Sequence, residues 1–146
     1  MENVEIVPNR DMGKIDAELI AHSLDLVAER CEDPTPLVYA RLFKTNPEME
    51  ALFVLDTHGH VRGHMLSEAI EGIIDFVGAR SYSDNMIRSE IVNHEGLGVP
   101  PEVFSTFFTT IMETFRDILG DEWTAEMDAA WRQVLAALAG TIAAHS

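Results

Sequence analysis

The stretch IVNHEGLGVPPEVF, residues 91–104, decides how the fold is interpreted. A histidine, His94, ends a short apolar-periodic segment, and two glycines and two prolines then interrupt the chain before a phenylalanine-rich segment begins. Ile87, Ile91 and His94 stand at i, i+4 and i+7, so a helix places the imidazole on its buried stripe. Taken alone, a single inward histidine is more often a hydrogen-bonded core residue than a ligand, so the spacing leaves both interpretations open.

Apolar residues recur every three or four positions on both sides of this stretch, as the buried face of a helix requires. The pattern predicts helices over residues 15–31, 35–43, 47–53, 61–78, 83–94, 100–120 and 124–142. Proline and capping residues mark several of the starts, as helix first turns prefer. No window alternates as a strand does. The sequence therefore predicts an all-α domain of seven to eight helices, none long enough for a simple up-and-down bundle.

The chain of 146 residues is long enough for one domain with a core and too short for two of ordinary size. Residues 1–14 lack helical period, so we expect an N-terminal extension followed by one domain over 15–146. The N-terminus has no apolar signal core, and no apolar run approaches the roughly 20 residues of a membrane span. Cys31 is the single cysteine, which excludes an internal disulfide and suits a reducing compartment. We therefore expect a cytoplasmic protein.

The charge balance argues against two classes of partner. The formal net charge is −15, and the ten basic residues form no run or stripe. Such a chain repels phosphate backbones and anionic lipid surfaces, so we expect neither nucleic-acid binding nor membrane binding.

Three segments carry a resemblance to a known family. They are VYARLFKTNPEMEALF (38–53), NHEGLGVPPEVF (93–104) and LGDEWTAEMDAAWRQVLAAL (119–138). In this order and spacing they resemble the globin family, most closely the globin domain of bacterial flavohaemoglobins and the bacterial single-domain haemoglobins. The resemblance covers roughly residues 15–143 and implies a globin-like fold of seven to eight helices around a haem pocket.

The resemblance implies haem b as the cofactor and His94 as the proximal ligand to the haem iron, because neutral imidazole is the usual protein ligand there. Tyr39 matches the second-helix tyrosine that points at the bound ligand, although it also suits the edge of a surface stripe. Phe53 matches the phenylalanine that stacks on the porphyrin. The full set implied for the pocket is Tyr39, Phe43, Phe53, Arg62, Leu66, Ile91, His94, Val99, Phe104 and Phe107. Glu90, at i−4, is either a hydrogen-bond partner of the His94 ring or part of a solvated face.

The distal side of the pocket departs from the family pattern. Placing Leu66 at the apolar pocket position puts Arg62 one turn earlier, where the family usually has glutamine or histidine. A shifted register offers His60 or His64 instead, but His64 would bring Glu68 into the pocket, and that conflict favours Arg62. An arginine there reaches the haem propionates, the bound ligand or only water.

His58, His60 and His64 also raise the question of a zinc site, because histidines at i and i+4 on a helix can share a metal ion. No cysteine accompanies them and glycines surround them. The sequence therefore argues against a dedicated metal site.

The predicted function is a haem-binding globin that reversibly binds a diatomic gas such as O2, NO or CO. Leu135 stands where flavohaemoglobins have a tyrosine, no matching glutamate is visible, and no reductase domain accompanies the globin. We therefore expect no self-contained enzyme, and nitric oxide dioxygenase activity only with a separate reductase. Two alternatives stay open: a haem-based gas sensor, and a globin-like module without haem. The apolar final helices also allow a homodimer.

Overall fold

The computed structural model describes residues 16–78, 86–87, 90 and 101–144, except for the side chains of 101 and 102. In chain order the elements are α2 (Ala17–Arg30), α3 (Thr35–Thr45), the 3-10 helix η1 (Pro47–Phe53), α4 (His60–Val77), α6 (Pro101–Leu119), the 3-10 helix η2 (Gly120–Glu122) and α7 (Ala125–Ala144). This described part contains no strand, so the predicted all-α fold is confirmed. The predicted extension over 1–14 lies outside the described residues, as does most of the predicted helix over 83–94.

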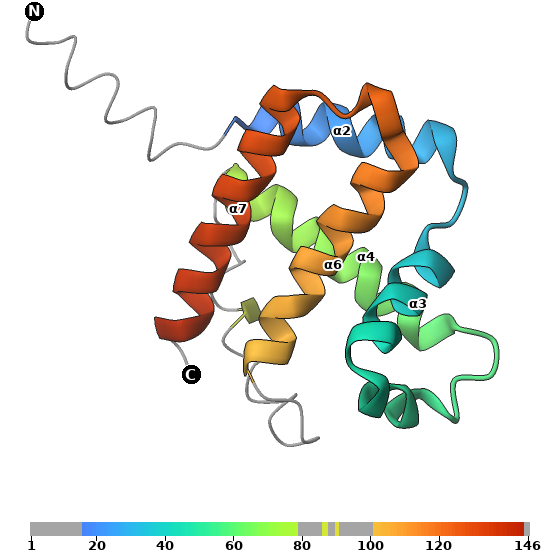
Figure 1. Ribbon diagram of the computed structural model, residues 1–146. Helices are drawn as coiled ribbons and strands as arrows, with labels where there is room; N and C mark the ends of the chain where they lie inside the picture. Colours follow the sequence, from blue (N-terminus) through green and yellow to red (C-terminus); the bar gives the residue numbers. More distant parts are fainter. Residues whose placement is uncertain (1–15, 79–85, 88–89, 91–100, 145–146) are drawn as a thin grey trace, which may run out of the picture.

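Helix α6 lies at the centre of the fold and packs against α2, α3 and α7 (Figure 1). Helix α4 crosses behind α6 and packs against α2 and α3. Helices α2 and α4 cross α6 at steep angles (Figure 1). The described helices therefore do not form an up-and-down bundle, in agreement with the prediction from the sequence. Among the described helices, none is long and apolar enough to cross a membrane.

The helix starts follow the capping residues that the sequence offers. Asp16 accepts a hydrogen bond from the backbone N–H of Leu19 at 3.1 Å at the start of α2. At the start of α7, the Thr124 hydroxyl accepts one from the N–H of Met127 at 3.1 Å. Each bond satisfies a first-turn N–H that has no partner within its helix, which typically stabilises a helix by about 1 kcal/mol.

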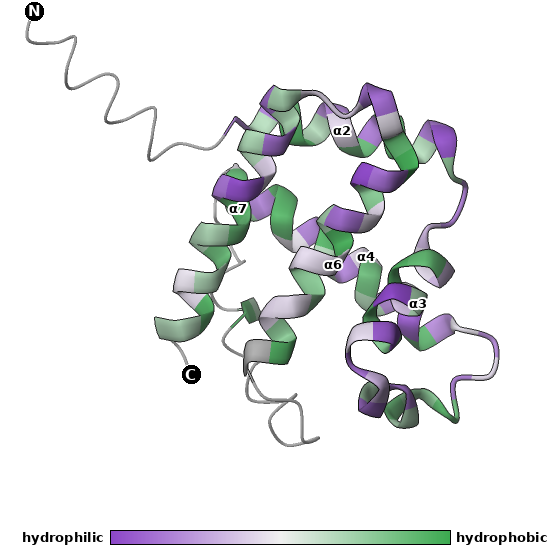
Figure 2. Ribbon diagram, in the orientation of Figure 1, coloured by the Kyte–Doolittle hydropathy of each residue, from purple (hydrophilic) through white to green (hydrophobic). Residues whose placement is uncertain are grey.

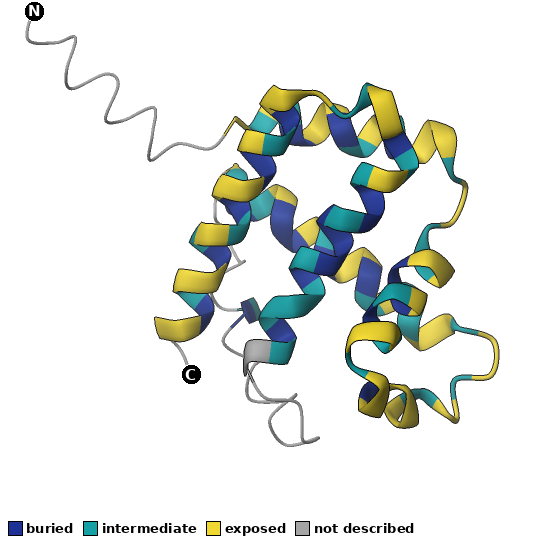
Figure 3. Ribbon diagram, in the orientation of Figure 1, coloured by how far each residue is buried: buried dark blue, intermediate teal, exposed yellow. Residues whose placement is uncertain are grey.

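The faces that the helices turn inward are hydrophobic and buried (Figures 2 and 3). Trp131 on α7 is fully buried and stacks edge-to-face on Phe115 of α6, with ring centroids 6.1 Å apart. Its indole Nε1–H donates to the Ser23 hydroxyl at 2.9 Å, and that hydroxyl donates to the carbonyl of Ile20 at 2.7 Å. These two bonds satisfy the buried indole N–H and the Ser23 hydroxyl, and the first joins α7 to α2.

Candidate functional site

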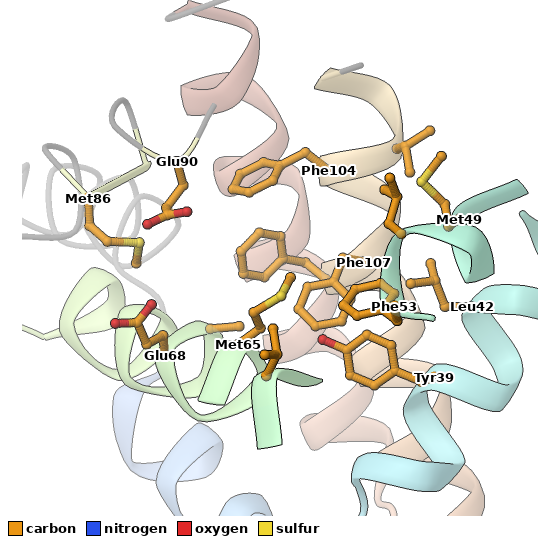
Figure 4. Close-up of a pocket in the computed structure, with 15 residues that line it drawn as sticks. Tyr39, Leu42, Met49, Phe53, Met65, Glu68, Met86, Glu90, Phe104 and Phe107 are labelled. Atoms are coloured by element: carbon orange, nitrogen blue, oxygen red, sulfur yellow. The ribbon is translucent and has the colours of Figure 1, made fainter. Parts of the chain in front are cut away.

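A cavity of about 200 Å³ lies between α3, η1, α4, the side chains of Met86 and Glu90, and α6 (Figure 4). We call it the Tyr39 cavity. Its walls are almost entirely apolar and are formed by Tyr39, Leu42, Met49, Leu52, Phe53, Val61, Met65, Glu68, Ala69, Met86, Glu90, Val103, Phe104, Phe107 and Phe108. A cavity of this kind is typical of a binding site for an apolar group with few polar anchors.

Aromatic rings close one end of the cavity. Tyr39 on α3 lies against Phe53 of η1 and Phe107 of α6, with ring centroids 5.4 and 5.5 Å away. Phe43, one turn along α3, packs on the outer side of Tyr39 and Phe53 at 5.8 and 5.7 Å. Phe104 lies one turn before Phe108 on α6 and adds a further ring to the wall. These contacts leave the rings little freedom, so this end of the cavity is preformed.

The Tyr39 hydroxyl is the polar atom that this aromatic end encloses. The side chain is 2% exposed, and the oxygen has no hydrogen-bond partner among the described residues. Figure 4 shows the oxygen pointing toward the cavity interior, on the side of Met65. Burial strongly raises the pKa of the phenol; the charge of Arg62 lowers it by a smaller amount, and the charge of Asp56 raises it slightly further. The group is therefore a neutral phenol at physiological pH, with its O–H free to donate to a ligand in the cavity.

The helical periodicity of α3 places Tyr39 on the inward face of that helix. Val38 and Leu42 are the buried apolar residues of α3, and Tyr39 lies beside them on the same inward face. A buried hydroxyl left without a partner costs about 1–3 kcal/mol. Among the described residues the Tyr39 hydroxyl lacks a partner on the cavity wall, which is the pattern expected where a ligand supplies the missing acceptor.

Helix α4 faces the cavity with Val61, Met65, Glu68 and Ala69, spaced at i, i+4, i+7 and i+8. Leu66, the distal pocket residue predicted from the family pattern, is 3% exposed and lies in the helical core, and it does not line the cavity. The face of α4 that meets the cavity is therefore displaced by one residue from the register assumed in that prediction.

Arg62, the other predicted distal residue, is held by the preceding loop. Its Nε donates to the Asp56 carboxylate at 3.0 Å, and an Nη donates to the Asp56 carbonyl at 2.8 Å. The same carboxylate accepts from the backbone N–H groups of Val61 and Arg62, both at 3.0 Å, and so caps α4. Burial opposes the charge on Asp56, but these hydrogen bonds and the arginine charge outweigh it and lower the pKa of the carboxyl. Arg62 does not line the cavity.

The histidines that offered the alternative distal register also lie away from the cavity. His58, His60 and His64 are exposed, and His64 Nε2 lies 3.3 Å from the carboxylate of Glu68. Glu68 itself lines the cavity, at its edge. Within the described part of the chain, no three histidine, cysteine or acidic side chains gather as a metal ion would require.

A comparison with known protein families shows to which family the protein with this cavity belongs. The profile of the Globin family matches residues 37–142, which include η1, α4, α6 and η2 and most of α3 and α7. The chain belongs to the globin family. Searches of curated proteins and of solved structures found no match. The narrower resemblance to bacterial single-domain haemoglobins and flavohaemoglobins therefore stays a prediction.

Several of the site residues predicted from the globin resemblance lie together in the structure. Tyr39, Phe53, Phe104 and Phe107 all line the cavity, and Phe43 supports it from outside. The predicted residues Ile91, His94 and Val99 lie outside the described residues, so the proximal ligand stays a prediction.

Sequence reasoning assigned no site role to several residues of this globin's cavity: Leu42, Met49, Leu52, Val61, Met65, Glu68, Ala69, Met86, Val103 and Phe108. For α4 a signal was present, because Val61, Met65 and Ala69 repeat every four residues beside the stripe of Leu66 and Ile73. A helix buried on two sides carries two such stripes, and one chain alone does not say which faces the ligand.

Proposed function

We propose that this globin binds haem b in the Tyr39 cavity, with His94 as the protein ligand to the iron, and that it reversibly binds a diatomic gas beside Tyr39. The observation that carries the proposal is the buried Tyr39 hydroxyl, which has no partner among the described residues and points into an apolar cavity of about 200 Å³. Membership of the globin family supports haem as the group that fills the cavity.

The described residues fit a flat apolar cofactor on one side. Phe53, Phe104 and Phe107 offer ring faces and edges, and Leu42 and Ala69 extend the apolar wall. The acidic side chains Glu68 and Glu90 lie apart from Tyr39 in the cavity (Figure 4), so the charges stand away from the aromatic end. A porphyrin needs such a wall, because its attachment depends on apolar burial and one strong bond to iron.

The haem iron supplies the bond to the gas, and the chain supplies its surroundings. Phe53 and Phe107 keep water from the Tyr39 side of the cavity because they pack directly on the phenol ring. The Tyr39 oxygen keeps its proton and donates it in a hydrogen bond to a polar gas such as O2. In a dry apolar site this bond is stronger than in water. CO is a weaker acceptor and gains less.

Haem titration of the purified protein tests the proposal. We expect the strong Soret band to grow to a stoichiometry of one haem per chain, and the reduced protein to shift its spectrum reversibly under O2 and under CO. A protein that leaves the spectrum of free haem unchanged would overturn the proposal and support a globin-like module without haem.

A further inference from the structure

The Tyr39 hydroxyl is a buried hydrogen-bond donor whose partner is missing from the described part of the chain. Its oxygen points into the cavity, on the side of Met65 (Figure 4). The phenol keeps its proton at physiological pH, because burial strongly raises its pKa. The group that completes this site therefore has to be a hydrogen-bond acceptor.

A water molecule is a poor candidate for that acceptor. A buried water typically makes about two to four hydrogen bonds, and apolar cavities that offer fewer stay dry. The rings of Phe53 and Phe107 pack directly against Tyr39. The carboxylates of Glu68 and Glu90 lie apart from the phenol oxygen (Figure 4). An acceptor atom carried on an apolar molecule suits both the hydroxyl and the walls around it.

The walls favour an aromatic molecule of modest size. The rings of Phe53, Phe104, Phe107 and Phe108 line the cavity beside Tyr39. Phe108 packs edge-to-face on both Phe104 and Phe107, and ring faces and edges of this kind also attract an aromatic guest. An apolar cavity of about 150 Å³ can bind benzene. The present cavity of about 200 Å³ therefore holds a benzene ring with a small substituent.

The charged residues of the cavity argue against an anionic ligand. Glu68 and Glu90 line it, and among the described residues no lysine or arginine does so. A carboxylate guest would lose its hydration in an apolar space and would meet these acidic side chains without a cation to pair with. One hydrogen bond from Tyr39 does not offset that cost. The cavity therefore suits a neutral molecule.

We propose that the haem-free protein binds a small neutral aromatic molecule in the Tyr39 cavity, and that a carbonyl or ether oxygen of this ligand accepts the hydrogen bond from the Tyr39 hydroxyl. Binding is non-covalent, and no part of the inference depends on haem. The hydroxyl has no protein bond to break among the described residues, so the ligand oxygen gains a bond that a hydrocarbon of the same shape lacks. The site therefore selects oxygen-bearing ligands.

Two probes of the same shape test this selection. Acetophenone carries a carbonyl, and α-methylstyrene carries a methylene group in its place. Each is titrated into the full chain without haem, as wild type and as Tyr39→Phe. The variant should bind acetophenone about 2- to 12-fold more weakly, the equivalent of one hydrogen bond. It should bind α-methylstyrene with an unchanged Kd, because the alkene leaves the hydroxyl unpaired both before and after binding.

Ser23→Ala is the matched control variant. It also removes a buried hydroxyl, but this one is bonded to Trp131 and Ile20 in the core and does not line the cavity. The variant should keep the wild-type ratio of the two dissociation constants. Benzoate provides an anion close to acetophenone in shape, and it should bind at least about tenfold more weakly than acetophenone at pH 7.

Methionine methyl signals in an NMR spectrum locate the probe. Acetophenone should shift the signals of Met49 and Met65, which line the cavity, and leave Met127 in the core of α7 unchanged. The inference is overturned if neither neutral probe binds, if Tyr39→Phe changes both by the same factor, or if benzoate binds as tightly as acetophenone. A shift of Met127 without Met49 and Met65 would also overturn it. Haem uptake is measured separately by its Soret band, so either proposal can fail while the other stands.

Discussion

Replacing Tyr39 with phenylalanine should raise the stability of the haem-free protein. The hydroxyl is buried and has no hydrogen-bond partner among the described residues, so its removal relieves a desolvation cost of about 1–3 kcal/mol. The ring and its contacts with Phe53 and Phe107 remain. For a domain of this size each kcal/mol raises Tm by roughly 2–4 °C, which thermal unfolding followed by circular dichroism resolves.

Ser23→Ala provides the matched control, because it also removes one buried hydroxyl. Here the hydroxyl is bonded at both ends, to the indole of Trp131 and to the carbonyl of Ile20. The variant leaves the indole N–H buried without an acceptor and should lose about 1–3 kcal/mol of stability. Two substitutions of equal size are thus expected to act with opposite signs.

With haem and gas present, the effect of Tyr39→Phe should reverse. One lost hydrogen bond of about 0.5–1.5 kcal/mol speeds O2 dissociation about 2- to 12-fold, and a bond of about 3 kcal/mol speeds it about 150-fold. Stopped-flow displacement measures the rate, and CO dissociation should change much less. The reasoning is refuted if the haem-free variant is less stable than wild type, or if both gases change equally, which would indicate altered packing or access.

Three further predictions concern the cofactor and the loop before α4. His94→Ala should abolish stable haem attachment or leave haem that free imidazole restores, and an unchanged haem spectrum would show that another residue is the ligand. Haem at a thousandfold excess over its Kd should stabilise the fold by about 4 kcal/mol, seen as a higher Tm, whereas an unchanged melting curve would contradict haem binding. The pKa of Asp56 is lowered below 3.8, so its carboxylate stabilises the fold above about pH 3.8 and this contribution is lost as the pH falls through the lowered pKa. Urea midpoints of Asp56→Asn should therefore lie below those of wild type at pH 7 and converge with them in acid; a constant gap would exclude the charge as the cause.

The helices were predictable because their signals are local. An apolar period of three to four residues, with a proline or capping residue at several of the starts, located α2, α3, α4, α6 and α7 to within a few positions. The same period places Trp131 on the apolar face of α7, and its side chain is buried. The period does not reveal the hydrogen bond from its indole to the Ser23 hydroxyl, because that bond joins residues 108 positions apart.

The distal residues predicted from the sequence, Arg62 and Leu66, do not line the cavity, and the reason is physical. Gly59 adopts a positive φ of 75°, and the turn there brings Asp56 back to the start of α4. The Asp56 carboxylate therefore binds Arg62, which the match to the family pattern had placed in the pocket. The orientation of α4 likewise depends on its neighbours α2 and α3, and no property of its own sequence fixes it.

The bond between Trp131 and Ser23 also bears on how the protein is made. At a ribosomal rate of about 5–20 residues per second, the 108 residues that separate the two take roughly 5–20 seconds to synthesise. During that interval α4 and α6, which also pack against α2, are synthesised, but α2 still lacks its contacts with α7. Nascent chains of this globin therefore leave the part of α2 that faces α7 uncovered until α7 arrives, and substitutions in α7 should reduce cellular yield.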